Sequence, residues 1–240
     1  MPLTKSTGNM YPWVTHMHTH LRGKCPHGCS YCYARLPVRG HAPLQQGPLR
    51  FEGRELGVRY GEGKTIFMEH KNDLFAQGVP VECIVRVLHH CLAYPNNTYV
   101  FQTKNPLRML HYVPVMPPDV ILGCTIESDA FIQPAIGNTL RPGYRADAMA
   151  NIADMGKLTF VSIEPVMKFD LASFMLLLQM AAPKWISIGA DSKGFHLPEP
   201  TEQEIVALVA FLKQQQVEVR LKSNLRRLAP SLFPKSAPSA

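Results

Sequence analysis

Short strand-like segments alternate with helix-like segments along most of the chain. Apolar and β-branched residues gather in seven runs of strand length, at 13–20, 64–70, 97–104, 120–127, 158–166, 185–191 and 217–223. Apolar residues recur at helical spacing at 80–94, 144–155, 171–182 and 201–216. This alternation predicts an α/β fold with a parallel sheet. Thr201 followed by Glu204 predicts a capping box at the start of the last helix.

The order of these segments favours one type of α/β fold. Seven parallel strands without a glycine-rich first turn indicate a partial, open TIM-type βα barrel of about six to seven parallel strands, rather than a doubly wound nucleotide-binding sheet. We expect this barrel to occupy residues 1–230. Residues 40–63 are rich in glycine, proline and charge, and we interpret them as a lid. Residues 231–240 have the composition of a flexible tail.

Composition supports a single domain with its own core. The chain has 240 residues, 46% hydrophobic and 18% charged, which argues against a disordered segment or a disulfide-stapled mini-protein. The most apolar stretch, 171–183, is interrupted by Gln179 and falls short of the roughly 18 to 20 residues of a membrane span. The first ten residues lack the apolar core of a signal peptide. We therefore expect a cytoplasmic protein without a membrane partner.

Net charge adds a weaker indication. The formal charge of +7 permits a polyanionic partner. Basic residues are frequent near the C-terminal end, where they suit either a phosphate backbone or an ordinary solvated surface. These residues are Lys213, Arg220, Lys222, Arg226, Arg227 and Lys235.

Three of the six cysteines form a compact motif. Cys25, Cys29 and Cys32 are spaced C-x3-C-x2-C on the loop that leaves the first predicted strand. Three thiolates leave one iron of a four-iron cluster open, because such clusters normally take four cysteines. A structural zinc ion is the alternative, and it needs a fourth ligand such as His27 or another cysteine. The spacing alone leaves both open. Cys83 and Cys91 share one face of a predicted helix, as core residues do.

The motif, with an aromatic residue before its last cysteine, resembles the radical S-adenosylmethionine (SAM) superfamily. The resemblance implies that Cys25, Cys29 and Cys32 bind a 4Fe–4S cluster whose open iron chelates the methionine part of SAM. It further implies reductive cleavage of SAM to a 5′-deoxyadenosyl radical, with a reductant such as flavodoxin or ferredoxin. Tyr31 would lie beside the adenine.

Motifs along nearly the whole chain are similar to a radical SAM family frequent in bacteriophages. If the protein is viral, its expected cytoplasmic location is the cytoplasm of the host. Two segments depart from the family pattern. Residues 189–192 read Gly-Ala-Asp-Ser, where the family more usually has Gly-Gly-Glu-Ser, and residues 69–73 replace Ser-x-Ser-Asp. The similar segments are Trp13, Cys32 to Ala34, Asn72 to Phe75, Val79-Pro80, Phe101 to Lys104, Leu122 to Glu127, Val161 to Pro165 and Trp185 to Ser192.

Polar residues follow the predicted strands, and in a βα barrel such positions point into the mouth. The resemblance implies that Glu69 or its neighbours hold the SAM amino group, Lys104 or Ser162 the carboxylate, and Glu127 the ribose. Each could instead be a solvated loop residue. The residues that we expect to bind the cofactor are Tyr31, Glu69, Lys104, Glu127, Ser162 and Glu164. The catalytic candidates are Cys124, Asp191 and Lys222.

Several histidines also stand out. His16, His18 and His20 alternate along the first strand and share one face. We interpret them as a polar wall or a substrate contact rather than a second metal site, because side chains on one strand splay apart. The pair His89-His90 receives no assignment from the sequence.

The function expected from this resemblance is radical modification of nucleic acid. We predict an isomerase that converts a nitrogen-linked amino-acid group on thymine in phage DNA into a carbon-linked one. The alternatives are another nucleobase reaction, similar to spore photoproduct lyase or directed at tRNA, and a non-catalytic metal protein that binds nucleic acid. A base within a duplex would have to be flipped out to react.

Overall fold

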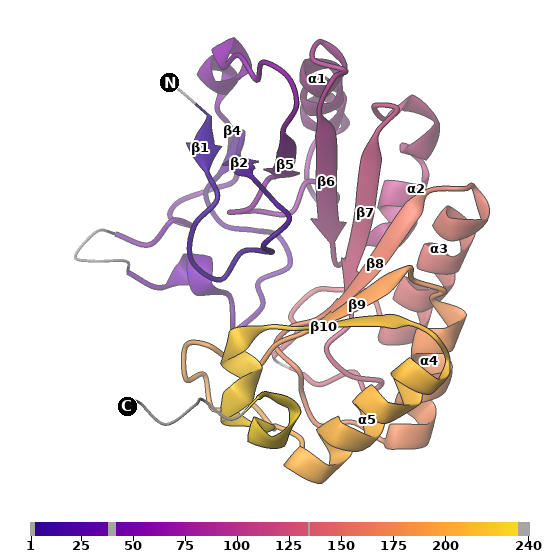
Figure 1. The fold of residues 1–240 in the computed structure, drawn as a ribbon. Helices are drawn as coiled ribbons and strands as arrows, with labels where there is room; N and C mark the ends of the chain where they lie inside the picture. Colours follow the sequence, from indigo (N-terminus) through magenta and orange to yellow (C-terminus); the bar gives the residue numbers. More distant parts are fainter. Residues whose placement is uncertain (1–2, 38–41, 134, 235–240) are drawn as a thin grey trace, which may run out of the picture.

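An eight-stranded sheet forms the centre of the computed structural model, which describes residues 3–37, 42–133 and 135–234 (Figure 1). Seven strands run parallel in chain order, and β1 (Thr4–Lys5) adds an antiparallel edge beside β2. The seven are β2 (His16–His18), β5 (Thr65–Met68), β6 (Thr98–Thr103), β7 (Val120–Thr125), β8 (Leu158–Ile163), β9 (Trp185–Ile188) and β10 (Glu218–Leu221). The predicted open α/β barrel is confirmed, whereas β1 was not predicted.

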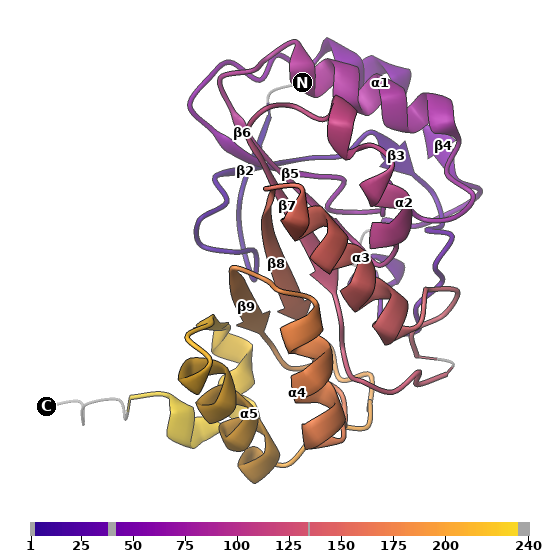
Figure 2. The same cartoon turned by 90° about the vertical axis from the view of Figure 1, so that its right-hand side faces the viewer.

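Five α-helices cover one face of this sheet (Figure 2). They are α1 (Val81–Leu92), α2 (Pro106–Leu110), α3 (Pro142–Asp154), α4 (Leu171–Met180) and α5 (Glu202–Gln214). The four predicted helices are confirmed to within a few residues. The short helix α2 was not predicted; it begins where the Asn105 side chain accepts the N–H of Arg108 and Pro106 occupies the first turn.

The predicted capping box begins α5. The Thr201 hydroxyl accepts the N–H of Glu204 at 3.3 Å, and the Glu204 carboxylate accepts the N–H of Thr201 at 2.7 Å. The two residues thus satisfy backbone donors that the first turn of a helix leaves free.

Apolar side chains lie on both faces of the strands, as a sheet covered on two sides requires. Ile66 points into the large core beneath the helices, whereas its neighbour Phe67 joins a second cluster on the concave face. In that second cluster Phe160 and Trp185 stack at 5.3 Å. Gly123 makes room for Phe160, because a Cβ at Gly123 would lie 2.3 Å from the Phe160 ring.

The N-terminal segment fills part of the concave side. The Tyr11 ring stacks on Trp13 at 5.2 Å, and its hydroxyl lies 2.9 Å from Ser162 Oγ and 2.8 Å from Gln102 Oε1. These contacts hold the segment against β6 and β8. Tyr11 and its neighbours Asn9 and Met10 thereby line the cavity at the carboxyl ends of the strands.

The segment interpreted as a lid contributes to the wall of the barrel. Its strand β4 (Arg50–Phe51) pairs antiparallel with β3 (Leu21–Arg22). Val58 and Tyr60 are buried in the core. Residues 50–60 therefore form part of the barrel wall rather than a lid. A lid remains a prediction for the residues before Arg50. Of these, residues 40 and 41 lie outside the described residues.

The other turns and the C-terminal end complete the fold. The short 3-10 helices are η1 (Tyr33–Arg35), η2 (Gly53–Gly57), η3 (Val113–Val115), η4 (Ser223–Arg227) and η5 (Pro230–Leu232). Leu232 and Phe233, which fall within the predicted tail of 231–240, pack against the core. Residues 235–240 of that tail lie outside the described residues. None of the described helices has both the length and the apolar character to cross a membrane.

Candidate active site

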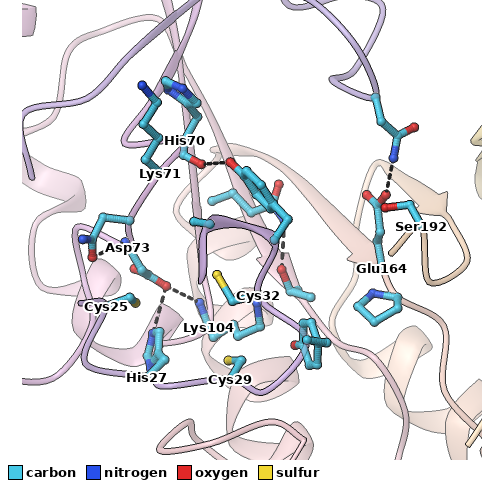
Figure 3. Close-up of a pocket in the computed structure, with 18 of the residues that line it drawn as sticks. Cys25, His27, Cys29, Cys32, His70, Lys71, Asp73, Lys104, Glu164 and Ser192 are labelled. Atoms are coloured by element: carbon cyan, nitrogen blue, oxygen red, sulfur yellow. Dashed lines mark hydrogen bonds and ion pairs between the residues drawn. The ribbon is translucent and has the colours of Figure 1, made fainter. Parts of the chain in front are cut away.

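A cavity of about 540 Å³ opens at the carboxyl ends of the parallel strands. Its volume lies within the range of small-molecule sites, and this end of a βα barrel is where such sites are built. Cys25, Cys29 and Cys32 all line the cavity, and the segments after β5, β6, β8, β9 and β10 supply the other walls (Figure 3). The cysteine motif and the predicted mouth of the barrel therefore coincide.

The cysteine loop is held by its own turns and by an arginine. The N–H of Gly28 donates to the carbonyl of Cys25 at 3.1 Å, and the N–H of Cys32 donates to that of Cys29 at 3.3 Å. The Arg35 guanidinium donates to the carbonyls of Gly28 and Cys29. The three thiols are thus fixed along one stretch of backbone.

The loop after β7 packs over the cysteine loop. The N–H of Asn138 donates to the His27 carbonyl at 2.6 Å, and the Cys29 thiol lies 3.4 Å from the Ile136 carbonyl. Gly137 is required here for two reasons: its φ is +59°, and a Cβ would lie 2.1 Å from the His27 carbonyl oxygen. The close approach buries Cys29.

A buried ion pair ties the cysteine loop to the strand ends. His27 Nε2 lies 2.9 Å from Asp73 Oδ2, and Asp73 also accepts the Thr103 hydroxyl and the N–H groups of Phe75 and Lys104. Burial alone would raise the pKa of Asp73, but His27 and these donors outweigh it and lower the pKa. A carboxylate with four donors holds its position rigidly.

This arrangement removes His27 as the fourth ligand that a zinc site would need. Its Nε2 faces Asp73, and its Nδ1 lies 3.1 Å from the Asn138 carbonyl. Both ring nitrogens are therefore engaged within the protein. His27 acts in the structure as a support for the loop.

Among the residues that the structure describes, a separate candidate metal-binding group has its ligand atoms all within 4.8 Å of one another; it consists of His18, His20 and His90 and contains no cysteine.

Cys25 and Cys29 are held in the protonated form when no metal is bound. Burial, and after it the Asp73 carboxylate, raise the pKa of Cys25 to about 12. Burial likewise raises the pKa of Cys29. A cation that binds here must displace these protons, because thiolates are the metal ligands.

A second buried network lies behind the cavity wall. Arg145 Nη1 is 2.6 Å from Glu127 Oε2, and the Tyr31 hydroxyl donates to Glu127 Oε1. Lys104 Nζ lies 4.0 Å from Glu127 and 5.3 Å from the centre of the Tyr31 ring. Burial opposes the charge on Glu127, but Arg145 and Lys104 outweigh it and lower the pKa of Glu127. Tyr31 and Lys104, which line the cavity, are thereby held from behind.

Lys104 remains charged despite its position. Burial would lower its pKa, but the negative charges of an ionised Cys29 sulfur and of the Glu127 carboxylate outweigh burial, so the pKa of Lys104 is raised. The site therefore keeps a cation beside the cysteine loop.

Glu69 lines the cavity but is already hydrogen bonded. Its Oε1 accepts the N–H of His20 at 2.8 Å and its Oε2 accepts the N–H of Leu21 at 3.0 Å. This carboxylate fixes the backbone that leads from β2 into the cysteine loop.

The opposite wall carries a second set of polar residues. Glu164 pairs with Lys222 at 2.7 Å and accepts the Asn9 amide at 2.9 Å. Asp191 accepts the N–H groups of Lys193 and Phe195. All these acidic groups thus have partners within the protein.

The structure brings most of the predicted site residues to one cavity. Those that line it are Cys25, Cys29, Tyr31, Cys32, Glu69, Lys104, Glu164, Asp191 and Lys222. Three others do not. Glu127 lies behind Tyr31, Ser162 is buried against Tyr11, and the Cys124 thiol is buried in the core 3.4 Å from the Thr125 carbonyl.

Sequence reasoning missed the residues that support the site. Asp73 lies only a few residues beyond a predicted strand, so its distance from the strand end was the available signal. Arg145 lies within a helix, and the helix pattern gives no signal that its side chain reaches Glu127. Asn9 lies between β1 and β2, and nothing in the sequence pattern indicated that its side chain reaches Glu164.

Three of the six basic residues predicted to form a surface near the C-terminus pair with acidic residues. Arg220 pairs with Glu218, Lys222 with Glu164, and Arg227 with Glu199. The Arg226 guanidinium lies over the Phe233 ring. Because three of the cations have acidic partners, the interpretation as a phosphate-binding patch weakens; Lys235 lies outside the described residues.

Solved structures with the same fold include radical SAM enzymes with TIM-type barrels. A spore photoproduct lyase mutant with bound AdoMet and dinucleoside spore photoproduct is 11% identical, with a TM-score of 0.61 over 90% of this chain and 78% of that one. A second spore photoproduct lyase mutant gives 11% identity and a TM-score of 0.62 over 91% and 79%. SuiB of Streptococcus suis bound to precursor peptide SuiA gives 10% and 0.63 over 93% of this chain and 52% of that one.

Sequence comparison gives a family rather than a characterised relative. No curated protein matches the chain. The profile of one family matches residues 12–203, a range that includes the cysteine loop and every strand from β2 to β9. The chain therefore belongs to the family described as protein of unknown function (DUF5131).

Proposed function

We propose that this protein is a radical SAM enzyme that modifies a base in nucleic acid. The observation that carries the proposal is the C-x3-C-x2-C loop, whose three thiols all line one cavity at the carboxyl ends of an open βα barrel. The same fold in an AdoMet-containing spore photoproduct lyase supports it. Cys25, Cys29 and Cys32 would hold a 4Fe–4S cluster.

The bound cluster and SAM would supply reductive cleavage of SAM to a 5′-deoxyadenosyl radical, with electrons from a flavodoxin or ferredoxin. The chain's own residues would bind and orient SAM. Lys104 is the cation beside the cysteine loop and suits the SAM carboxylate, while the Tyr31 ring would lie beside the adenine. Glu127 would act through both side chains, because it contacts each of them.

Further contacts with SAM remain part of the proposal. Glu69 and Glu164 line the cavity and would help to bind its amino and ribose groups. Asp191 and Lys222 line the cavity, where Lys222 pairs with Glu164, and they are the candidates for contact with the substrate. Ser162 would act through Tyr11, to which it is hydrogen bonded.

An apolar wall between these two sides suits a flat substrate. Met10, Tyr11, Met17 and Phe67 line the cavity where the barrel interior is filled. Stacking on aromatic and apolar side chains is a common way to hold an unpaired base. A base in a duplex would have to be flipped out to reach this wall, at a cost of a few kcal/mol.

Two lysines favour a substrate with phosphates. Lys71 follows β5 and Lys193 follows β9, so they approach the cavity from separate parts of the sheet. Neither has an acidic partner among the described residues. Together with a formal charge of +7, they would attract a polyanion.

As a finer proposal, the substrate is a thymine in phage DNA that carries an amino-acid-derived group. The reaction would move the attachment from nitrogen to carbon, an isomerisation in the cytoplasm of the host. This proposal rests on the resemblance to a phage-associated family and on the cavity lysines Lys71 and Lys193.

Peptide modification is the second candidate. SuiB, which shares the fold, has been solved bound to a precursor peptide. A peptide would not need Lys71 and Lys193, so these residues separate the two candidates.

The first experiment tests the chemistry. Protein reconstituted with iron and sulfide without oxygen, then given SAM and dithionite, should release 5′-deoxyadenosine. Cys29→Ala should lose this product, whereas the control Cys124→Ala should keep it, because its thiol lies in the core. Equal product from both variants, or none from the wild type with a full cluster, would contradict the proposal.

The second experiment tests the substrate class. Binding of a single-stranded oligonucleotide should weaken as salt rises, and Lys71→Ala and Lys193→Ala should each make the negative slope of log K against log salt concentration less steep by about one. Lys213→Ala, on the exposed part of α5, is the control. A slope unchanged in both cavity variants would favour the peptide candidate.

A further inference from the structure

Three buried histidines meet outside the cavity, between β2 and α1. His18 ends β2, His20 lies two residues later, and His90 lies in α1. One ring nitrogen from each lies within 4.8 Å of the others. None of the three lines the cavity. The strand pattern placed His18 and His20 on one face, and the structure adds His90 from a separate element.

Each ring has one nitrogen already occupied by an acceptor. His18 Nε2 lies 3.3 Å from the Glu55 carboxylate, and His20 Nδ1 lies 2.8 Å from the Glu69 carboxylate. His90 Nε2 lies 2.9 Å from the Val58 carbonyl. A nitrogen that faces a carboxylate or carbonyl must carry the hydrogen, so in a neutral ring the other nitrogen presents a lone pair. Histidines that bind metals are commonly held in this way.

The three remaining nitrogens converge with one hydroxyl. His20 Nε2 lies 2.9 Å from His90 Nδ1, and Tyr60 Oη lies 2.6 Å from His18 Nδ1 and 3.1 Å from His90 Nδ1. When the three rings are neutral, their hydrogens point away from these contacts. The Tyr60 hydroxyl hydrogen is then the one hydrogen among them, and Tyr60 can donate it to a single acceptor. The contact between His20 and His90 therefore joins two lone pairs and lacks a positive charge, which either an extra proton or a metal cation would supply.

All three rings are buried, so a positive charge among them needs compensation from nearby groups. Neutral imidazole is the form that binds metals. The Glu55 and Glu69 carboxylates stand behind two of the rings and would offset the charge of a cation.

We propose that His18, His20 and His90, with Tyr60 as an oxygen ligand, bind one zinc ion in addition to the group held by the cysteines. Three imidazoles and one oxygen match the ligand types and number of a four-coordinate zinc site. The ion would join β2, α1 and the segment before β5, and so would fix the wall behind Glu69 and the start of the cysteine loop.

The test separates this site from the cysteines. In a full-length variant with Cys25→Ala, Cys29→Ala and Cys32→Ala, metal analysis should still find about one zinc per chain. Adding His90→Gln should remove it. His89→Gln is the matched control, because His89 is the exposed neighbour on the same helix and should leave the zinc content unchanged.

A second measurement guards against a variant that fails to fold. The cysteine variant with all its histidines intact is stripped of metal with a chelator and titrated with Co²⁺. It should develop the visible absorption bands of a tetrahedral site without the near-ultraviolet band of thiolate ligands. Its melting temperature should rise on addition of zinc. Zinc well below one per chain in the cysteine variant, together with no cobalt bands, would overturn the proposal and leave an extra proton between His20 and His90.

Discussion

The two halves of the barrel share one parallel sheet but bury different groups. From β7 to β10, strands and helices alternate regularly, and the buried ionisable residues are Glu127, Arg145 and Asp191. From β2 to β6, no α-helix is found between β2 and β5 among the described residues. The buried ionisable residues of this half are His18, His20, His27, Glu55, Glu69, Asp73 and His90.

The difference indicates which half carries chemistry. Burying a charge or a polar group is costly unless partners compensate it. The first half pays this cost repeatedly around the cysteine loop, and each group there has a specific partner. The second half is mainly a scaffold, and its ion pairs near the site include Arg145 with Glu127, behind the cavity wall, and Glu164 with Lys222, on the opposite wall. The following predictions test this division.

The largest effect is expected from Arg145→Met. The variant leaves the Glu127 carboxylate buried without its main partner, since Arg145 is itself fully buried at 2.6 Å from it. Breaking a buried pair in this way costs about 3–5 kcal/mol of the free energy of unfolding. Denaturant titration measures it, with Arg141→Met, an exposed residue beside the start of α3, as the control. A loss below 1 kcal/mol would mean that the scaffold half does not depend on this pair.

The same pair makes stability sensitive to acid. The pKa of Glu127 in the folded protein lies below its ordinary value of 4.5, so the pair contributes fully above pH 4.5 and is lost as pH falls through the lowered pKa. The free-energy gap between the wild type and Arg145→Met should therefore narrow from pH 7 to pH 3. Denaturant titrations along this series measure it, and a gap independent of pH would contradict the assignment of charge to Glu127.

In the first half, Asp73→Asn should cost about 2–3 kcal/mol, because charge-assisted hydrogen bonds to His27 and to three other donors are weakened. The cysteine loop should loosen as well, so Cys25 and Cys29 should react faster with a thiol reagent. Asp154→Asn, at the exposed end of α3, is the control. Lost stability with unchanged thiol reactivity would separate Asp73 from the loop.

The sequence predicted the secondary structure elements better than the contacts between them. Apolar periodicity places all seven parallel strands and four helices, because each pattern reports the burial of its own segment. Such patterns do not show which side chains of distant segments contact each other in the fold. His27 is a reasonable zinc ligand by spacing, yet Asp73 binds its ring from another segment. His18 and His20 were correctly placed on one face, but nothing along the strand shows that His90 meets them.

The smallest effect is expected at the capping box of α5. Thr201→Ala should cost about 1 kcal/mol, because it removes the acceptor for the Glu204 N–H and leaves that donor to water. Thr201→Ser keeps an oxygen at the same position and should restore most of the loss. Both variants should leave the reactivity of the cavity thiols unchanged, because α5 supplies no residue to the cavity. A changed thiol reactivity in Thr201→Ala would show that even the ends of the outer helices set the geometry of the cysteine loop, and the division between a scaffold half and a chemical half would then fail.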